Sequence, residues 1–190
     1  MNRCRHCKVM FEPNMSSLQI CCSYQCAAAW TITVKGQQHV AKEKRKDIRA
    51  RKLAIKTKSD WTRETQQAFN AFIRERDYDQ PCISCGKPAT YETNQWDCGH
   101  YRSVGASPEL RFVEDNAHKQ CKKCNRNLSG NIVEYRLRLI DKIGMRKLNW
   151  LEGPHESPNL ITKDLIQLKS QYITKKRQLQ DEREYQQKGV

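Results

Sequence analysis

The chain has 190 residues, of which 37% are hydrophobic, and its mean hydropathy is −0.90. This composition argues against one large core, and small cores usually depend on disulfides or metals for stability. The formal net charge of +14 favours a polyanionic partner, with nucleic acid as the first class to consider. No apolar run approaches the ~20 residues that span a bilayer, and no N-terminal stretch resembles a signal peptide. We therefore expect a cytoplasmic protein with no membrane partner.

The first predicted module, residues 1–34, contains a cysteine cluster. Cys4 and Cys7 form a CxxC, and Cys22 and Cys26 form a CxxxC. Thiols stay reduced in the cytosol, so four cysteines at this spacing predict a tetrahedral zinc site rather than disulfides. Cys21 is an alternative to Cys22, which we prefer because its loop to Cys26 is tighter. A structural role is the main expectation for this module.

Residues 35–58 are predicted to form a basic helical arm. Between Lys42 and Lys58 there are nine Lys/Arg residues, against the two acids Glu43 and Asp47, and no Gly or Pro. We expect this arm to contact DNA phosphates, which gives affinity without a base code. The predicted DNA-binding residues of the arm are Lys42, Lys44, Arg45, Lys46, Arg49, Arg51 and Lys52.

Three further helices and two strands are predicted after the arm. Ser59 or Asp60 is expected to cap a helix that Pro81 ends, with Trp61, Thr65, Ala68, Phe69, Phe72 and Ile73 on its apolar face. Strand-like pieces follow at 95–101 and 110–113, and then a helix that Gly144 stops. Residues 59–150 would form the main domain. Residues 151–190 would contribute a last helix, from about 160 to 184, that either packs on the core or forms a dimer contact.

A second cysteine cluster lies within the predicted main domain. Cys82 and Cys85 form one CxxC, and Cys121 and Cys124 form another. Two such pairs predict a zinc site that holds together the two ends of the segment between them. That segment carries His100, and histidine is suited to deprotonating water near neutral pH.

The residues around this cluster resemble two known nuclease patterns. A CxxC, a Gly-His-Tyr at 99–101, Asn116 five residues before the second CxxC, and Asn125 directly after it resemble the HNH pattern and phage endonuclease VII. The longer string from Cys82 through Trp96-Asp97 and Leu110-Arg111-Phe112 to Asn125 resembles the lambda-type NinG/Rap family. The preceding stretch at 70–77 matches that family as well, and the resemblance covers roughly residues 50–145 well.

The resemblance implies a role for each matching residue. His100 would be the general base, Asn125 a ligand of a catalytic Mg²⁺ or Mn²⁺, and Asn116 a side chain that braces the loop. Gly99 departs from the pattern, because many HNH proteins carry a metal-binding Asp there. Asp97 could substitute, since residues two apart on a strand share a face. His118 is a candidate second ligand or could exchange roles with His100. Arg102 and Arg111 are candidate phosphate contacts.

The sequence therefore predicts an α+β protein with a zinc-bound ββα-metal (HNH-like) nuclease core flanked by helices and an N-terminal zinc module. The expected cofactors are two structural Zn²⁺ ions and a catalytic Mg²⁺ or Mn²⁺. The resemblance implies cleavage of branched recombination intermediates such as Holliday junctions, by a homodimer on the junction. Two alternatives stay open, namely a non-catalytic zinc-finger protein that binds nucleic acid and an HNH endonuclease that acts on ordinary duplex.

Overall fold

The computed structural model describes residues 1–90 and 95–188. The chain forms two compact units, Met1–Lys56 and Thr57–Val190. Helices predominate and the sheets are small, so the α+β class is observed. None of the described helices combines the length and the apolarity needed to cross a membrane.

The first unit is a small cysteine-rich module joined to a long helix. Strand β1 (Asn2–Arg3) pairs with β2 (Met10–Phe11), and α1 (Tyr24–Thr31) follows. Helix α2 (Val34–Ala54) begins directly afterwards, because the Thr33 side chain accepts from the Gly36 amide. At Gly36 a Cβ atom would lie 2.0 Å from the Trp30 carbonyl oxygen, so the close turn between the helices requires glycine. Most of the predicted basic arm, residues 35–58, is therefore helix α2, which belongs to the same compact unit as the cysteine-rich module.

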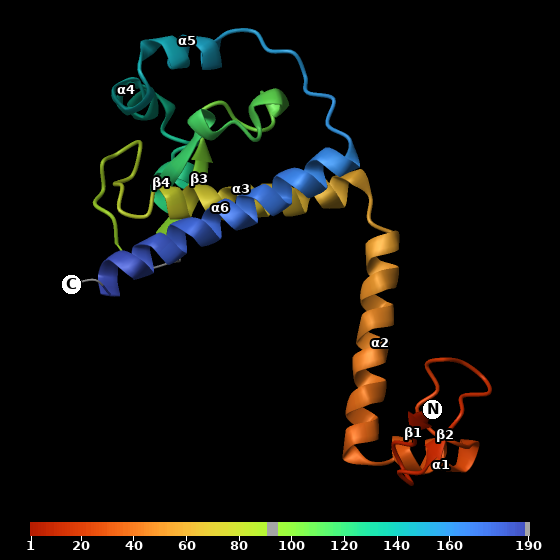
Figure 1. Ribbon diagram of the computed structural model, residues 1–190. Helices are drawn as coiled ribbons and strands as arrows, with labels where there is room; N and C mark the ends of the chain where they lie inside the picture. Colours follow the sequence, from red (N-terminus) through yellow and green to blue (C-terminus); the bar gives the residue numbers. More distant parts are fainter. Residues whose placement is uncertain (91–94, 189–190) are drawn as a thin grey trace. The chain divides into compact units, whose positions relative to one another are not determined.

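Two long helices form the base of the second unit. Helix α3 (Lys58–Arg76) starts from a capping box in which Thr57 is the N-cap and Asp60 the third residue, so the prediction of Ser59 or Asp60 as the cap was wrong. Helix α3 buries Thr65, Phe69, Phe72 and Ile73, as its periodicity predicted. Helix α6 (Thr162–Lys188) runs along α3 (Figure 1).

The contact between α3 and α6 shows whether the last helix packs on the core, one of the two alternatives left open above. Leu165 and Tyr172 of α6 are buried, and the Leu165 carbonyl accepts a hydrogen bond from the Thr65 hydroxyl at 2.9 Å. Tyr172 packs edge-on against Phe69. Leu168 and Leu179 of the predicted stripe also pack against this core, whereas Ile161 lies before the helix and is exposed. The prediction that the stripe packs on the core is thus confirmed for α6 itself.

An antiparallel hairpin lies against α3. Strand β3 (Trp96–His100) pairs with β4 (Ala117–Cys121), with Asp97 opposite Gln120 and Gly99 opposite His118. The predicted strand at 110–113 was wrong, because a 3₁₀ turn (Pro108–Leu110) occupies its start. The true partner strand is buried along its whole length although its sequence is Ala-His-Lys-Gln-Cys. A buried strand with polar side chains has no hydrophobic alternation, so pattern analysis misses it.

Two short helices cover the other side of the hairpin region. Helix α4 (Ile132–Ile143) ends at Gly144, as predicted, and Gly144 adopts a φ of 81°. Helix α5 (Met145–Glu152) was not predicted. The two helices form a core with Ile83 and Leu110 through the buried side chains of Tyr135, Leu139, Leu148 and Leu151.

Candidate functional site

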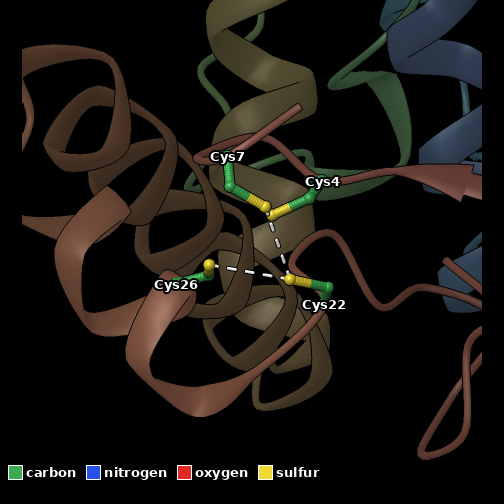
Figure 2. Close-up of side chains that lie close together, drawn as sticks. All are labelled: Cys4, Cys7, Cys22 and Cys26. Atoms are coloured by element: carbon green, nitrogen blue, oxygen red, sulfur yellow. Dashed lines mark hydrogen bonds between the residues drawn. The ribbon is translucent and has the colours of Figure 1, made fainter. Parts of the chain in front are cut away.

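The four N-terminal cysteines come together as the spacing predicted. The sulfur atoms of Cys4, Cys7, Cys22 and Cys26 all lie within 4.8 Å of one another. The Cys22 sulfur is 3.5 Å from that of Cys7 and 3.6 Å from that of Cys26 (Figure 2). Tetrahedral Zn²⁺ with bonds of about 2.3 Å places its sulfur ligands about 3.8 Å apart, so this cluster fits zinc.

The geometry also decides between Cys21 and Cys22. Cys21 is buried against Cys4 and Trp30 in the small core of the module and is not part of the sulfur cluster. Cys22 lies at the start of the CxxxC loop, and its sulfur faces those of Cys7 and Cys26 (Figure 2). Cys22 is therefore the ligand candidate, and Cys21 is a core residue.

Replacement of Cys22 by serine is expected to remove one zinc ion per chain, because the cluster would keep only three thiolates. Cys21→Ser is the matched control, since it changes the neighbouring residue in the same way, and this variant should keep two. Elemental analysis of protein purified without chelator measures the difference. A Cys21→Ser protein that has lost one zinc, with Cys22→Ser unchanged, would reverse the ligand assignment.

The second cluster joins the ends of the β3–β4 region. The sulfurs of Cys82, Cys85, Cys121 and Cys124 lie within 4.8 Å of one another, and those of Cys85 and Cys121 are 3.8 Å apart. The Cys121 amide donates to the Cys82 sulfur at 3.3 Å. Donors aimed at sulfur favour the thiolate form that zinc requires. This cluster also fits a zinc ion.

His100 is the last residue of β3 and has a defined tautomer. Its Nε2 lies 3.1 Å from the Arg111 carbonyl oxygen, and its ring packs on Phe69 of α3 at 5.7 Å between centroids. A carbonyl oxygen only accepts, so Nε2 carries the hydrogen and Nδ1 keeps its lone pair. Burial lowers the pKa of His100 below its usual 6.5, so the ring is neutral at pH 7. Nδ1 is thus able to accept a proton.

His100 and Asn125 line the same open pocket, whose volume is about 660 Å³. Asn125 comes from a π-helical turn (Lys123–Asn127) that directly follows β4 and includes Cys124. Arg102 lines the pocket as well, whereas Arg111 lines a separate one of about 310 Å³. None of the described residues around the His100 pocket is acidic. Cys98 also lines it, and burial raises the pKa of this thiol to about 12, so it stays neutral.

Asp97 is engaged by two neighbours from the π-helical turn. Arg126 forms a two-pronged ion pair with it, at 2.7 and 2.9 Å, and the Asn125 side-chain amide donates to Asp97 Oδ2 at 3.0 Å. Burial alone would raise the pKa of Asp97, but the hydrogen bonds from Arg126 and Asn125 outweigh it and leave the pKa below its usual value. Because Asn125 uses its NH₂ group on Asp97, its Oδ1 is left as the available acceptor.

Asn116 makes the contacts of a loop brace. It is fully buried; its Oδ1 accepts from the Arg102 amide at 2.8 Å, and its Nδ2 donates to the carbonyls of Arg102 and Leu110 at 3.0 and 3.2 Å. These bonds hold the loop that follows His100. The side chain has no free polar group left to face a substrate.

His118 lies in the interior and not in the pocket. It is 2% exposed, and its Nδ1 lies 3.2 Å from the Tyr135 hydroxyl, which itself donates to the Gly99 carbonyl. Burial lowers the pKa of His118 to about 3, so the ring is neutral. A Cβ atom at position 99 would lie 2.1 Å from Gln120 Oε1, so any other residue there, including aspartate, would require the buried Gln120 side chain to move.

Three contributors to this site were not found from the sequence: Phe69, Arg126 and Tyr135. Phe69 was identified only as a core residue, although its ring also packs on His100. Arg126 follows the Cys-Asn pair directly, which is the one local signal that could have indicated it. Tyr135 acts through contacts with residues distant in sequence, and no local pattern encodes those.

The fold and the clusters define an α+β protein with two groups of four cysteines that can each hold a metal ion. The family model for the bacteriophage lambda NinG protein matches residues 1–182. The chain is 40% identical over 196 residues to protein ninG of Salmonella phage P22, covering 95% of each chain. It is 39% identical over 196 residues to protein ninG of Escherichia phage lambda, covering 95% of this chain and 94% of that one. The chain therefore belongs to the NinG family. No solved structure matches it.

Proposed function

We propose that the protein is a metal-dependent endodeoxyribonuclease that cuts branched DNA. The observation that carries this proposal is the shared pocket of His100 and Asn125, beside a cysteine cluster that fits zinc. An unprotonated imidazole nitrogen and an oriented amide oxygen in one pocket are groups that phosphodiester hydrolysis needs and that a purely structural zinc module does not.

In the proposed reaction, His100 Nδ1 takes a proton from the attacking water. The water oxygen forms the new bond to phosphorus, and the bond to the 3′ oxygen breaks. A divalent ion, when bound, would stabilise the charge on the phosphate and on the leaving oxygen. Asn125 Oδ1 would hold that ion together with phosphate oxygens of the substrate, which would also supply the negative charge that the pocket lacks.

Asp97 acts in this proposal as a positioning residue, not as a direct ligand. Its carboxylate already accepts hydrogen bonds from Arg126 and Asn125 and orients the Asn125 amide. Asp97→Asn should therefore slow cleavage less than Asn125→Ala, and extra Mg²⁺ or Mn²⁺ should partly rescue Asn125→Ala. Asn127→Ala, on the same turn and exposed, serves as the control.

One property of the same pocket favours the second candidate function, a non-catalytic DNA-binding protein. Its described lining contains no carboxylate, and the nearest candidate, Asp97, is ion-paired. A DNA-binding protein held together by zinc would have no need of a carboxylate there. Cleavage activity decides between the two functions.

The branched substrate class is proposed from the resemblance described above, and the +14 charge supports a DNA partner. Purified protein with Mg²⁺ should cut a four-way junction and a fork faster than a linear duplex of the same sequence. Equal rates on all three would support the duplex endonuclease instead, and no cleavage with Mg²⁺ or Mn²⁺ would support the binding protein.

We propose that two chains bind each four-way junction, since a two-fold dimer matches a two-fold substrate. Light scattering of the complex measures this stoichiometry.

A further inference from the structure

One face of α2 is basic and carries no acidic residue. At 3.6 residues per turn, its cations occupy roughly a third of the helix circumference. All of them are exposed, and they are Lys35, Lys42, Arg45, Lys46, Arg49 and Lys52. Glu43 and Asp47, the only acids of α2, lie outside this arc, although Glu43 reaches its edge in an exposed ion pair with Lys46 at 2.9 Å. Lys44 and Arg51, which the sequence alone also predicted as DNA contacts, lie on the opposite side of the helix, so the basic face leaves them out. The charge of the arm is therefore concentrated on one side.

A pocket of about 520 Å³ lies at the start of the same face. It is lined by Thr33, Val34 and Lys35 of the α1–α2 junction and by Arg5, His6, Lys8 and Trp30 of the cysteine module. None of these described residues carries a carboxylate. The Arg5 guanidinium lies 5.6 Å from the centre of the Trp30 ring, and His39 packs edge-on against that ring at 5.1 Å. The pocket is thus cationic, with an aromatic wall that is held in place.

Lys35 joins the two features, because it lines the pocket and belongs to the basic face of α2. Lys42 follows two turns after Lys35, and from there to Lys52 the cations recur at every turn. A long row of exposed cations suits the backbone of a nucleic acid better than it suits a single small anion.

We propose that the unit Met1–Lys56 is a second DNA-binding element, in which the Arg5–Lys35 pocket takes one phosphate and the basic face of α2 follows the backbone. The N-terminal cysteine module then has a binding role besides its structural one. Contacts of this kind give affinity without base readout, as an enzyme that acts on DNA of any sequence requires. The inference rests on the proposed function only in taking DNA as the partner.

The helix provides a closely matched pair of variants. Lys42→Gln/Arg49→Gln removes one Lys and one Arg, seven residues apart, from the basic face. Lys44→Gln/Arg51→Gln removes the same two residue types at the same spacing from the opposite side. Binding of the full-length chain to a fluorescein-labelled four-way junction is measured by anisotropy across a salt series. Mg²⁺ is omitted so that no DNA is cut.

The face variant is expected to flatten the slope of log affinity against log salt by about two, because each phosphate contact contributes ~0.9. At 0.1 M salt its affinity should fall on the order of tenfold or more. The opposite-side variant should stay close to the unmodified chain. Equal effects of the two variants would show only general attraction to positive charge and would overturn the proposal.

The pocket is tested separately by Arg5→Gln/Lys35→Gln, again with Lys44→Gln/Arg51→Gln as the charge-matched control. Zinc content reports whether the module stays folded. We expect the Arg5→Gln/Lys35→Gln variant to keep two zinc ions, to bind the junction more weakly, and to show a flatter slope of log affinity against log salt. Unchanged binding with two zinc ions would remove the pocket from the proposal. These binding measurements need no cleavage. A protein that does not cut DNA, but whose binding is weakened only by the basic-face variant, would therefore contradict the proposed enzyme activity and leave this inference standing.

Discussion

Replacement of His100 by alanine is expected to slow single-turnover cleavage by about 10²–10⁴-fold, the range typical for loss of a general base. Zinc content and DNA affinity should not change. His100 is outside both cysteine clusters, and the proposed DNA affinity rests on cations elsewhere in the chain. The nitrogen that we propose as the base is Nδ1, since Nε2 donates to the Arg111 carbonyl.

His100→Gln is the second variant of this experiment. Its amide is able to keep the hydrogen bond to Arg111 but offers no comparable base, so it should be as slow as His100→Ala. Added imidazole should restore part of the activity of His100→Ala, which loss of packing against Phe69 alone would not permit. Either variant cutting at the unmodified rate would rule out His100 as the base.

The pH dependence follows from the lowered pKa of His100. A base works only when unprotonated, so kcat/KM should rise with pH through the pKa of the free protein and then level off. Because burial places that pKa below the usual 6.5, the acid limb should lie below pH 6.5 and the plateau should include pH 7. The His100 variants should lack this limb.

Replacement of Cys121 by serine is expected to remove the second zinc ion and abolish the native β3–β4 hairpin. Apparent zinc binding in small structural sites is worth about 10–16 kcal/mol, as large as the whole stability of a typical domain. A two-stranded sheet is marginal alone, and Cys121 is the residue of β4 opposite Trp96. His100 and Asn125 would no longer share a pocket, so cleavage should be lost as well.

Cys98→Ser is the matched control for Cys121→Ser. Cys98 lies on the paired strand, outside both clusters, and should keep two zinc ions and a cooperative thermal transition. Zinc content, near-ultraviolet circular dichroism and the fluorescence of buried Trp96 together measure the difference. Cys121→Ser with two zinc ions and an unchanged melting transition would exclude a structural metal at this cluster.

Several features of this protein are encoded locally and could be predicted from its sequence. The CxxC and CxxxC spacings predicted both cysteine clusters, because a metal knuckle is a short loop whose geometry depends on a few neighbouring residues. The apolar faces of α3 and α6 followed from helical periodicity, and the end of α4 followed from the preference of glycine for helix C-termini. His100 and Asn125 were identified through the resemblance to the HNH pattern, and the structure puts them around one pocket.

Other features were decided only by contacts between distant residues. Strand β4 was missed because its buried polar side chains form hydrogen bonds with residues elsewhere in the chain, such as His118 Nδ1 with Tyr135 and Gln120 Nε2 with Ser84. The ion pair between Asp97 and Arg126 forms only because the π-helical turn lies beside β3. Cys22 rather than Cys21 joins the sulfur cluster because Cys21 packs against Trp30. Spacing and periodicity are properties of a short segment. Hydrogen-bond partners, burial and the resulting pKa values arise only once tertiary structure brings separate segments together.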